Sequence, residues 1–401
     1  MRIEKEESGI CAVKGVRAYG IKEGSKGLAV IEGKGKAVGM FTTNTIKAAP
    51  VLFTRKQLER CEGRLRAVIA NSGCANSFTG EEGMRNAERM AELVSSSLGV
   101  DKEAVAVAST GSIGKQLDMG LLERQLDEVV KRLSSDAKGS EAAARAIMTT
   151  DTFHKEWAVR IAQPANPREK VVIGGIAKGA GMIFPHLKQA TMLSFIYTDA
   201  DLSEEALRRS LKDAVDHSFN LVVVDGDMST NDMVLLVSTG RRGEISEADF
   251  KEGLTIVCTE LAKLMARDGE GATKFVEVRV REASSVEHAR EVAKSIVRSP
   301  LVKSAIFGER PDLVCGRIIA ALGSCAIAAG DVDPEGISIR IKGDSEVLAV
   351  ENGVFVDVSA AAGKIMNGKE LVIEVALGIG EAGATAWGCD LSYEYVRINA
   401  G

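Results

Sequence analysis

Residues 181–200 read GMIFPHLKQATMLSFIYTDA, and a polar loop gives way to an apolar run within them. The run from Thr191 to Thr198 has strand character. Its first residue is a threonine that directly follows Ala190, in the middle of the chain. A threonine hydroxyl is an effective nucleophile when a base lies beside it, and its own α-amine is such a base once the preceding bond is cut. Thr191 could therefore be the nucleophile of a self-cleaved chain or an ordinary strand residue.

The composition narrows the class of protein. The chain has 401 residues, a net charge of −5 and 45% hydrophobic residues, which suffice for a sizeable core. No basic block interleaved with aromatic residues occurs, so we expect no nucleic-acid partner. No run of 18 apolar residues occurs, so we expect no membrane span. The start, MRIEKEESGI, lacks an apolar signal segment, and we therefore expect a cytoplasmic protein.

The cysteine and histidine patterns favour no metal site. The seven cysteines contain no CxxC pair, and the four histidines contain no HxxxH pair. We interpret the cysteines as small, reduced core residues. The loop DGDMSTND (225–232) resembles a calcium loop only superficially, because residue 236 is leucine where a bidentate glutamate would be needed. No metal or cofactor is expected.

The order of the predicted elements indicates an α/β fold with at least one mixed sheet. Strands are expected over 65–73 and 170–178, and again repeatedly after residue 335, including the closing LSYEYVRINAG. Helical spacing of apolar residues predicts further elements. They are 88–99, 121–135, 203–218 with Ser203 as its start, 245–269, and 284–297 with a capping box from Ser284 to Glu287.

Two glycine-rich turns carry candidate chemistry. In STGSIG (109–114), which follows an apolar run, backbone amides and a hydroxyl at the end of a strand can form an oxyanion hole. A plain turn is the alternative interpretation. In DGEGATKF (268–275), Glu270 stands between two glycines and could orient an amine or a hydroxyl. A solvated turn is the alternative there.

Taken together, the motifs resemble the ornithine acetyltransferase (glutamate N-acetyltransferase) family of arginine biosynthesis. They occur in order over nearly the whole chain, and the joint match is specific although each piece is weak. The matching segments are FTTNTIKAAPV (41–51), VIANSGCANSFTG (68–80), ASTGSIG (108–114), MTTDTF (148–153), GGIAKGAGMI (174–183), ATMLSFIYTDA (190–200), DGDMSTND (225–232), DGEGATK (268–274) and AWGCDLSYEYVRINA (386–400).

The resemblance implies an N-terminal-nucleophile fold of two intertwined fragments, a light one of residues 1–190 and a heavy one of residues 191–401. Cleavage between Ala190 and Thr191 would free the nucleophile Thr191, and Thr110 with Gly111 would form the oxyanion hole. The implied substrate contacts are Thr152, Lys178, Thr191, Glu270 and Asn399. The implied assembly is a heterotetramer of two light and two heavy fragments.

Two departures from the family pattern affect these expectations. Four residues, His186 to Gln189, separate Pro185 from Ala190, whereas the family usually has two, so the loop before the cleavage site is longer. The family usually continues past this Asn399 to a terminal threonine that contacts substrate. This sequence ends at Gly401, and we expect that contact to be absent or replaced.

The resemblance implies a ping-pong transfer. Thr191 would take the acetyl group from N2-acetyl-L-ornithine, release ornithine and pass the acetyl group to L-glutamate, with Glu270 positioning an amine. Whether acetyl-CoA also serves as donor stays open. The alternatives are a self-cleaving aminopeptidase or amidase, in which water accepts the acyl group, and an uncleaved paralogue that binds amino acids without turnover.

Overall fold

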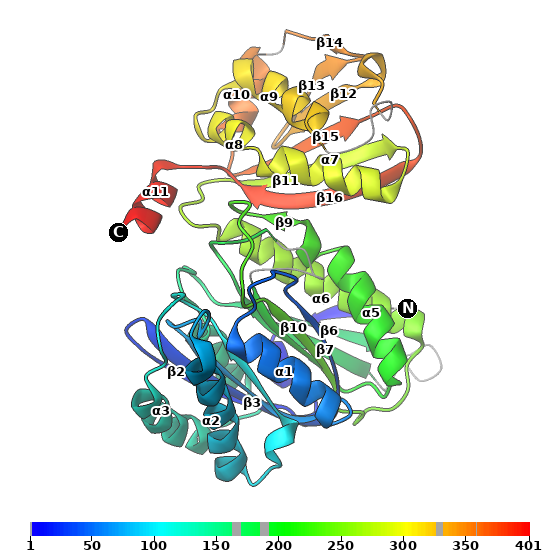
Figure 1. Ribbon diagram of the computed structural model, residues 1–401. Helices are drawn as coiled ribbons and strands as arrows, with labels where there is room; N and C mark the ends of the chain where they lie inside the picture. The colour runs from blue at the N-terminus through cyan, green and yellow to red at the C-terminus, as the bar shows by residue number, and fades with distance from the viewer. Residues whose placement is uncertain (1, 163–169, 185–191, 326–331, 358) are drawn as a thin grey trace. The chain divides into compact units, whose positions relative to one another are not determined.

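The computed structural model describes residues 2–162, 170–184, 192–325, 332–357 and 359–401. Two compact units can be distinguished, and each contains its own sheet (Figure 1). Unit 1 consists of Met1–Asn220 and Asp227–Ala262, and unit 2 of Leu221–Gly226 and Lys263–Gly401. The predicted α/β class, with mixed sheets and helices, is confirmed. The predicted fragment boundary at residue 190 concerns chain cleavage and stays a prediction.

Unit 1 contains a nine-stranded sheet in the order β1-β6-β7-β8-β10-β3-β4-β5, with β2 paired to β3. Its pairs β8–β10 and β4–β5 are parallel, and the other neighbours are antiparallel. The strands are β1 (Arg2–Glu6), β2 (Arg17–Glu23), β3 (Lys26–Phe41), β4 (Arg64–Ser72), β5 (Val105–Ser109), β6 (Lys155–Ala162), β7 (Lys170–Lys178), β8 (Leu193–Thr198) and β10 (Met233–Ser238).

A common core joins the β3–β5 end of this sheet to strands β7, β8 and β10. Strand β3 is long, and its register with β4 shifts between Glu32 and Gly35. Register shifts of this kind bend a strand. One cluster of buried side chains joins Ala106 of β5 to Phe195 of β8 and Leu235 of β10. Since alternate residues of a strand point to opposite faces, the other residues of β5 serve a second core.

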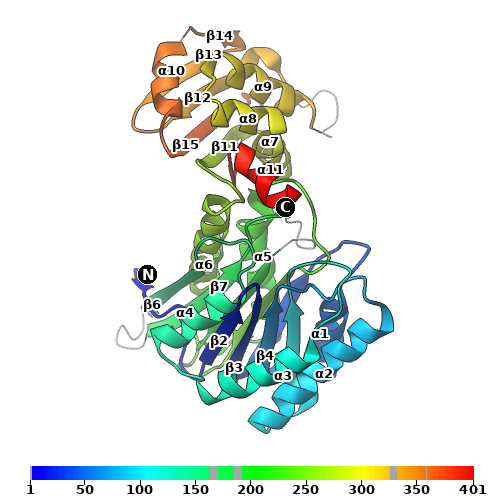
Figure 2. The ribbon, with the colours of Figure 1, turned by 90° about the vertical axis from the view of Figure 1, so that its left-hand side faces the viewer.

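Helices cover the outer faces of the folded sheet (Figures 1 and 2). Residues of α1, α2 and α3 share the second core with β3, β4 and β5. On the far side, Leu261 of α6 contacts Gly175 of β7. The helices of this unit are α1 (Ala49–Arg60), α2 (Gly80–Leu98), α3 (Met119–Lys131), α4 (Ala137–Ala146), α5 (Glu204–Asp216) and α6 (Glu247–Arg267), whose last residues belong to unit 2.

Unit 2 is built on a sheet in the order β14-β13-β12-β15-β11-β16-β9. Helix α7 packs on β11 and β16, and α8 and α9 pack beside α7. The strands are β9 (Val222–Val223), β11 (Phe275–Ala283), β12 (Ser338–Lys342), β13 (Glu346–Glu351), β14 (Val354–Phe355), β15 (Glu370–Ala376) and β16 (Ala382–Cys389). The helices are α7 (Val286–Arg298), α8 (Pro300–Phe307), α9 (Pro311–Gly323), α10 (Ser359–Met366) and α11 (Tyr393–Ala400).

The first residues of α5 and α7 can be compared with the N-caps predicted from the sequence. Ser203 caps α5, because its hydroxyl accepts a hydrogen bond from the Ala206 N–H at 3.2 Å, as predicted. The predicted capping box at Ser284 is wrong. Ser285 caps α7 by accepting from the His288 N–H at 3.0 Å, while the Ser284 hydroxyl lies 2.8 Å from His288 Nδ1.

The predicted closing strand is also wrong, because residues 393–400 form α11. Their tyrosine, valine and isoleucine content is typical of strands, but Tyr393 and Val396 are exposed rather than packed in a sheet. Ser392 caps the helix by accepting from the Glu394 N–H at 3.1 Å and is itself held by a 2.6 Å hydrogen bond to the Gly271 carbonyl. This anchor is a tertiary contact, so local propensity did not decide the element.

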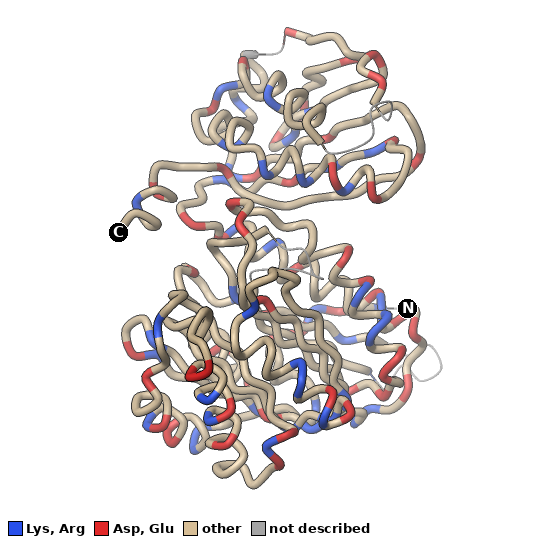
Figure 3. The backbone as a smooth tube through the Cα atoms, viewed as in Figure 1, with Lys and Arg blue, Asp and Glu red and all other residues tan. Residues whose placement is uncertain are grey.

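Acidic and basic residues are mixed along the surface helices (Figure 3). Several form ion pairs one helical turn apart, such as Arg132 with Glu128 at 2.9 Å in α3. Such exposed pairs contribute little to stability. Within the described ranges, no helix is long and apolar enough to cross a membrane.

The shared core of unit 1 can be tested at Phe195, which is fully buried. We expect Phe195→Ala to lower the free energy of unfolding of this unit by about 3–5 kcal/mol, because the lost ring leaves a cavity in the core that β5, β8 and β10 share. Urea unfolding followed by circular dichroism measures the change. Phe78→Ala is the matched control: Phe78 is 77% exposed, so a change within about 0.5 kcal/mol is expected. Equal losses in both variants would contradict this description of the core.

Candidate active site

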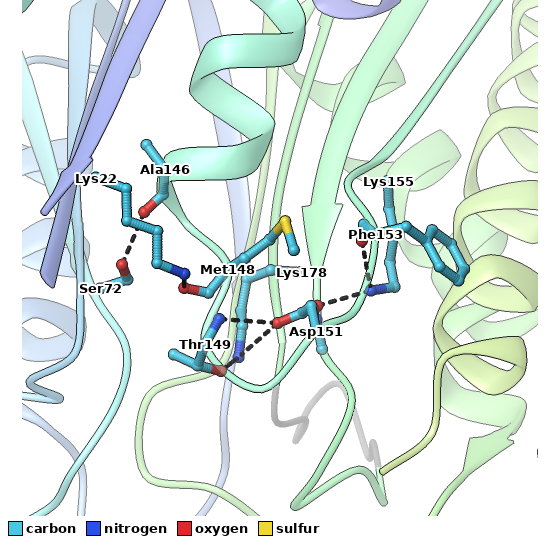
Figure 4. Close-up of polar contacts among 10 residues, drawn as sticks. Lys22, Ser72, Ala146, Met148, Thr149, Asp151, Phe153, Lys155 and Lys178 are labelled. Atoms are coloured by element: carbon cyan, nitrogen blue, oxygen red, sulfur yellow. Dashed lines mark hydrogen bonds and ion pairs between the residues drawn. The ribbon is translucent and has the colours of Figure 1, made fainter. Parts of the chain in front are cut away.

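A buried charged cluster lies at the end of β7 (Figure 4). The Asp151 carboxylate accepts at Oδ1 from Lys155 Nζ and from the Gly179 N–H, both at 2.7 Å. Its Oδ2 accepts from the Thr149 N–H at 3.0 Å and lies 3.9 Å from Lys178 Nζ. Lys178 also donates to Thr149 Oγ1 at 2.9 Å. We call Thr149, Asp151, Lys155 and Lys178 the Asp151 cluster.

The charged groups of this cluster are buried, so they need one another as partners. Lys155 is fully buried, and Lys178 and Asp151 nearly so. Burial by itself would raise the pKa of Asp151, but the ammonium groups of Lys178 and Lys155 and the hydrogen bonds hold that pKa well below its usual range. Asp151 is therefore ionised at neutral pH. Within the cluster itself, two ammonium groups accompany one carboxylate, which leaves the cluster with a net positive charge.

The same end of the sheet holds the start of β8. Lys178 is the register partner of Leu193, and Leu193 is in turn the partner of Met233 at the start of β10. The Met233 N–H also donates to the Met192 carbonyl at 2.9 Å. The predicted cleavage site, Ala190 and Thr191, lies outside the described residues, which resume at Met192.

The predicted oxyanion turn follows β5. Gly111 has φ of 129°, and a Cβ there would overlap the backbone of Gly73 and Cys74, so no other residue fits. Among the hydrogen bonds of the described residues, none is donated by the Gly111 N–H or made by the Thr110 hydroxyl. The Thr110 N–H, in contrast, is engaged by the Asn71 carbonyl at 3.0 Å. One hydroxyl and one N–H are thus available to a ligand oxygen.

A buried carboxamide joins this turn to β10. Asn231 Nδ2 donates to the carbonyl oxygens of Ser109 at 2.9 Å and Ala75 at 2.6 Å. Its Oδ1 accepts from the Thr230 hydroxyl at 2.6 Å. Because Asn231 is two residues before Met233, the segment that contacts the start of β8 also holds the turn after β5. The structure thereby gathers the turn and the ends of β7 and β8 around one segment of unit 1.

Unit 2 brings together two further predicted residues. Asn399 Nδ2 donates to Glu270 Oε2 at 2.7 Å, although 129 positions separate them in sequence. Glu270 is nearly buried, so the alternative of a solvated turn is wrong. Close by, Asp390 accepts from the N–H groups of Thr273 and Lys274 at 2.8 and 3.0 Å. The closing segment is thus held on the loop that carries Glu270.

Sequence reasoning found some of these residues and missed others. Thr152 is exposed, directly after Asp151 in the loop before β6. Asp151 and Thr149 lie in the MTTDTF motif, but only Thr152 had been singled out there. Asn231 lies in DGDMSTND (225–232), a segment that matched the family pattern but whose chemistry was considered only as a metal site. Its signal, an amide before an apolar strand, is too common to single it out.

Fold and site together define an α/β protein in which an ammonium group and unengaged hydrogen-bond donors accompany the strand ends of unit 1. The ArgJ family model matches residues 13–401. The chain is 51% identical to a glutamate N-acetyltransferase of Methanosarcina mazei, over 98% of each chain. It is 45% identical to the arginine biosynthesis bifunctional protein ArgJ of Symbiobacterium thermophilum, over 90% of this chain and 88% of that one.

Among solved structures, the chain is similar to the arginine biosynthesis bifunctional protein argJ of Bacillus halodurans. The identity is 40%, the TM-score is 0.49, and the match covers 53% of this chain and 100% of that one. This chain belongs to the ArgJ family. The predicted family and class of activity, an acetyltransferase of arginine biosynthesis, are thereby confirmed.

The Asp151 cluster predicts a pH-dependent contribution to stability. At pH 7, Asp151→Asn should lower the free energy of unfolding by roughly 3–5 kcal/mol, because it leaves two buried ammonium groups without their carboxylate. The folded-state pKa is lowered, so this contribution is complete above the unfolded pKa, roughly 4, and is lost progressively as pH falls from there through the lowered folded-state pKa. Urea unfolding between pH 7 and 3 should show a constant gap between the two proteins down to about pH 4 and a narrowing gap below it.

Asp127→Asn is the matched control, since Asp127 is exposed on α3. It should change the unfolding free energy by less than about 0.5 kcal/mol at every pH. A constant gap between wild type and Asp151→Asn from pH 7 to 3 would contradict the ionised cluster.

Proposed function

We propose that this chain transfers the acetyl group of N2-acetyl-L-ornithine to L-glutamate through an acetylated Thr191, after the chain has cut itself between Ala190 and Thr191. The observation that carries the proposal is the unengaged pair of donors at Thr110 and Gly111 in a chain of the ArgJ family. The names of its relatives, glutamate N-acetyltransferase and bifunctional protein ArgJ, support the acceptor and the pathway.

The reaction balances in two half-reactions. Thr191 Oγ attacks the acetyl carbonyl carbon, and the α-amine of Thr191 takes the hydroxyl proton. The bond from that carbon to the ornithine nitrogen then breaks, and the leaving amine receives the proton. In the second half, the glutamate amine attacks the acetyl ester, the bond to Oγ breaks, and Thr191 recovers its proton. Each half passes through a tetrahedral oxyanion, which the Thr110 hydroxyl and the Gly111 N–H would stabilise.

Lys178 is assigned to the α-carboxylate that both substrates carry. Its buried ammonium belongs to a cluster with net positive charge, and its register partner Leu193 lies two residues after Thr191 in the sequence. Thr152, next to Asp151, would contact the same substrate. Glu270, held by Asn399, would receive an amine, because a carboxylate attracts the ammonium of ornithine. The cut enzyme would assemble as two light and two heavy fragments in the cytoplasm.

Intact mass spectrometry of the denatured protein tests the cleavage. We expect two fragments, residues 1–190 and 191–401. When N2-acetyl-L-ornithine is added without glutamate, the mass of the second fragment should increase by one acetyl group. Thr191→Ala should give one uncut and inactive chain, because the same hydroxyl cuts the bond and carries the acetyl group. Thr191→Ser should still cut.

The assay should follow acetyl transfer to glutamate beside release of free acetate, with acetyl-CoA as a second donor. An uncut wild type that transfers acetyl groups at full rate would refute the nucleophile mechanism. Acetate as the main product would favour the amidase. Native mass spectrometry reports the assembly of the fragments.

The oxyanion turn yields a separate prediction. Thr110→Ala should lower kcat by about 10²–10³-fold, since one donor to the oxyanion is lost, with little change in thermal stability. Ser112→Ala, in the same turn and exposed, is the matched control and should keep wild-type turnover. Unchanged kcat in Thr110→Ala would remove this hydroxyl from the mechanism.

A further inference from the structure

The Asp151 cluster holds the backbone around Lys178 in place as well as lying close to its ammonium group. Both oxygens of Asp151 hold backbone: Oδ2 accepts from the Thr149 N–H at 3.0 Å and Oδ1 from the Gly179 N–H at 2.7 Å. Gly179 directly follows Lys178, so one carboxylate holds the loop after α4 against the end of β7. This brings the Thr149 hydroxyl within 2.9 Å of Lys178 Nζ (Figure 4).

One N–H of the ammonium is therefore directed by a neutral acceptor. Its ion pair with Asp151 is long at 3.9 Å, whereas Lys155 is bound to the same carboxylate at 2.7 Å. A hydroxyl acceptor orients one N–H of an ammonium without neutralising its charge. The hydrogen bond to Thr149 therefore gives one N–H of the Lys178 ammonium a fixed direction.

We propose that Thr149 is a positioning residue whose hydroxyl directs the Lys178 ammonium toward the α-carboxylate of the substrate. The inference rests on the proposed function, in which Lys178 binds that carboxylate. Thr149 itself needs no contact with the reacting atoms. Its influence is on binding of molecules that carry the carboxylate, and it should act equally on the acetyl donor and on the acceptor.

Thr149→Val keeps the shape of the side chain and removes the acceptor. We expect it to raise the KM for N2-acetyl-L-ornithine and for glutamate about 10-fold, the scale of one hydrogen bond to a charged group, with kcat within about 2-fold. Thr149→Ser restores the hydroxyl and should restore both KM values. Thr150→Val is the matched control, because Thr150 is the exposed neighbour, and it should match wild type.

A donor without the carboxylate separates positioning from a structural role. The probe is the analogue of N2-acetyl-L-ornithine in which hydrogen replaces the carboxyl group. In wild type, kcat/KM should fall with this analogue, and Thr149→Val should lower it no further, because the interaction that Thr149 supports is already missing. An equal loss with both donors would overturn the proposal, as would a Thr149→Val variant with wild-type KM values. Thr149→Ala is the second variant should valine disturb folding.

Lys178→Met on the same two donors distinguishes the two proposals. If wild type transfers no acetyl group, or if Lys178→Met loses as much with the analogue as with the carboxylate donor, the proposed function of Lys178 fails. If Lys178→Met loses activity only with the carboxylate donor while Thr149→Val does not, the role of Thr149 alone is refuted.

Discussion

The central strands β7, β8 and β10 of unit 1 are buried on both faces and carry no charged side chain between their end residues, and this constraint determines where charged groups can lie. Strand β8 lies between β7 and β10, and every one of its residues is buried. A charged group cannot be buried there without partners. Charged side chains are therefore restricted to the ends of these strands, and Lys178 lies at one such end. Asn231 and Thr110 lie beside strand ends as well. Layered packing concentrates the candidate chemistry at those ends.

The Asp151 cluster illustrates how such an end is stabilised. A buried carboxylate is tolerated only when its oxygens are satisfied, and Asp151 receives N–H donors from two backbone positions and from Lys155. Meeting this requirement ties two segments of chain together, residues 149–155 and the end of β7, and rigidity at Lys178 follows from it. A catalyst needs preorganised groups, since geometry fixed before binding costs nothing at the moment of reaction.

Local patterns predicted most elements but not those set by distant contacts. The apolar runs that became β4, β7 and β8 carried their signal within a few residues. The signal at 393–400 was equally local and misleading, because the start of α11 is anchored by the bond from Ser392 to Gly271. The shift of the α7 cap from Ser284 to Ser285 changes one residue of register, a difference finer than capping patterns determine.

The sequence by itself determined the family, the α/β class and the residues Thr110, Gly111, Lys178, Glu270 and Asn399 as candidates. The order of the motifs along the chain is enough for these assignments, and no three-dimensional information is needed. Only the tertiary structure decided that Thr149 and Asp151 hold Lys178, that Asn231 joins β10 to the turn after β5, and that Asn399 is bound to Glu270. Each of these is a directional contact between residues brought together by folding, and neither periodicity nor composition encodes the distance between side chains.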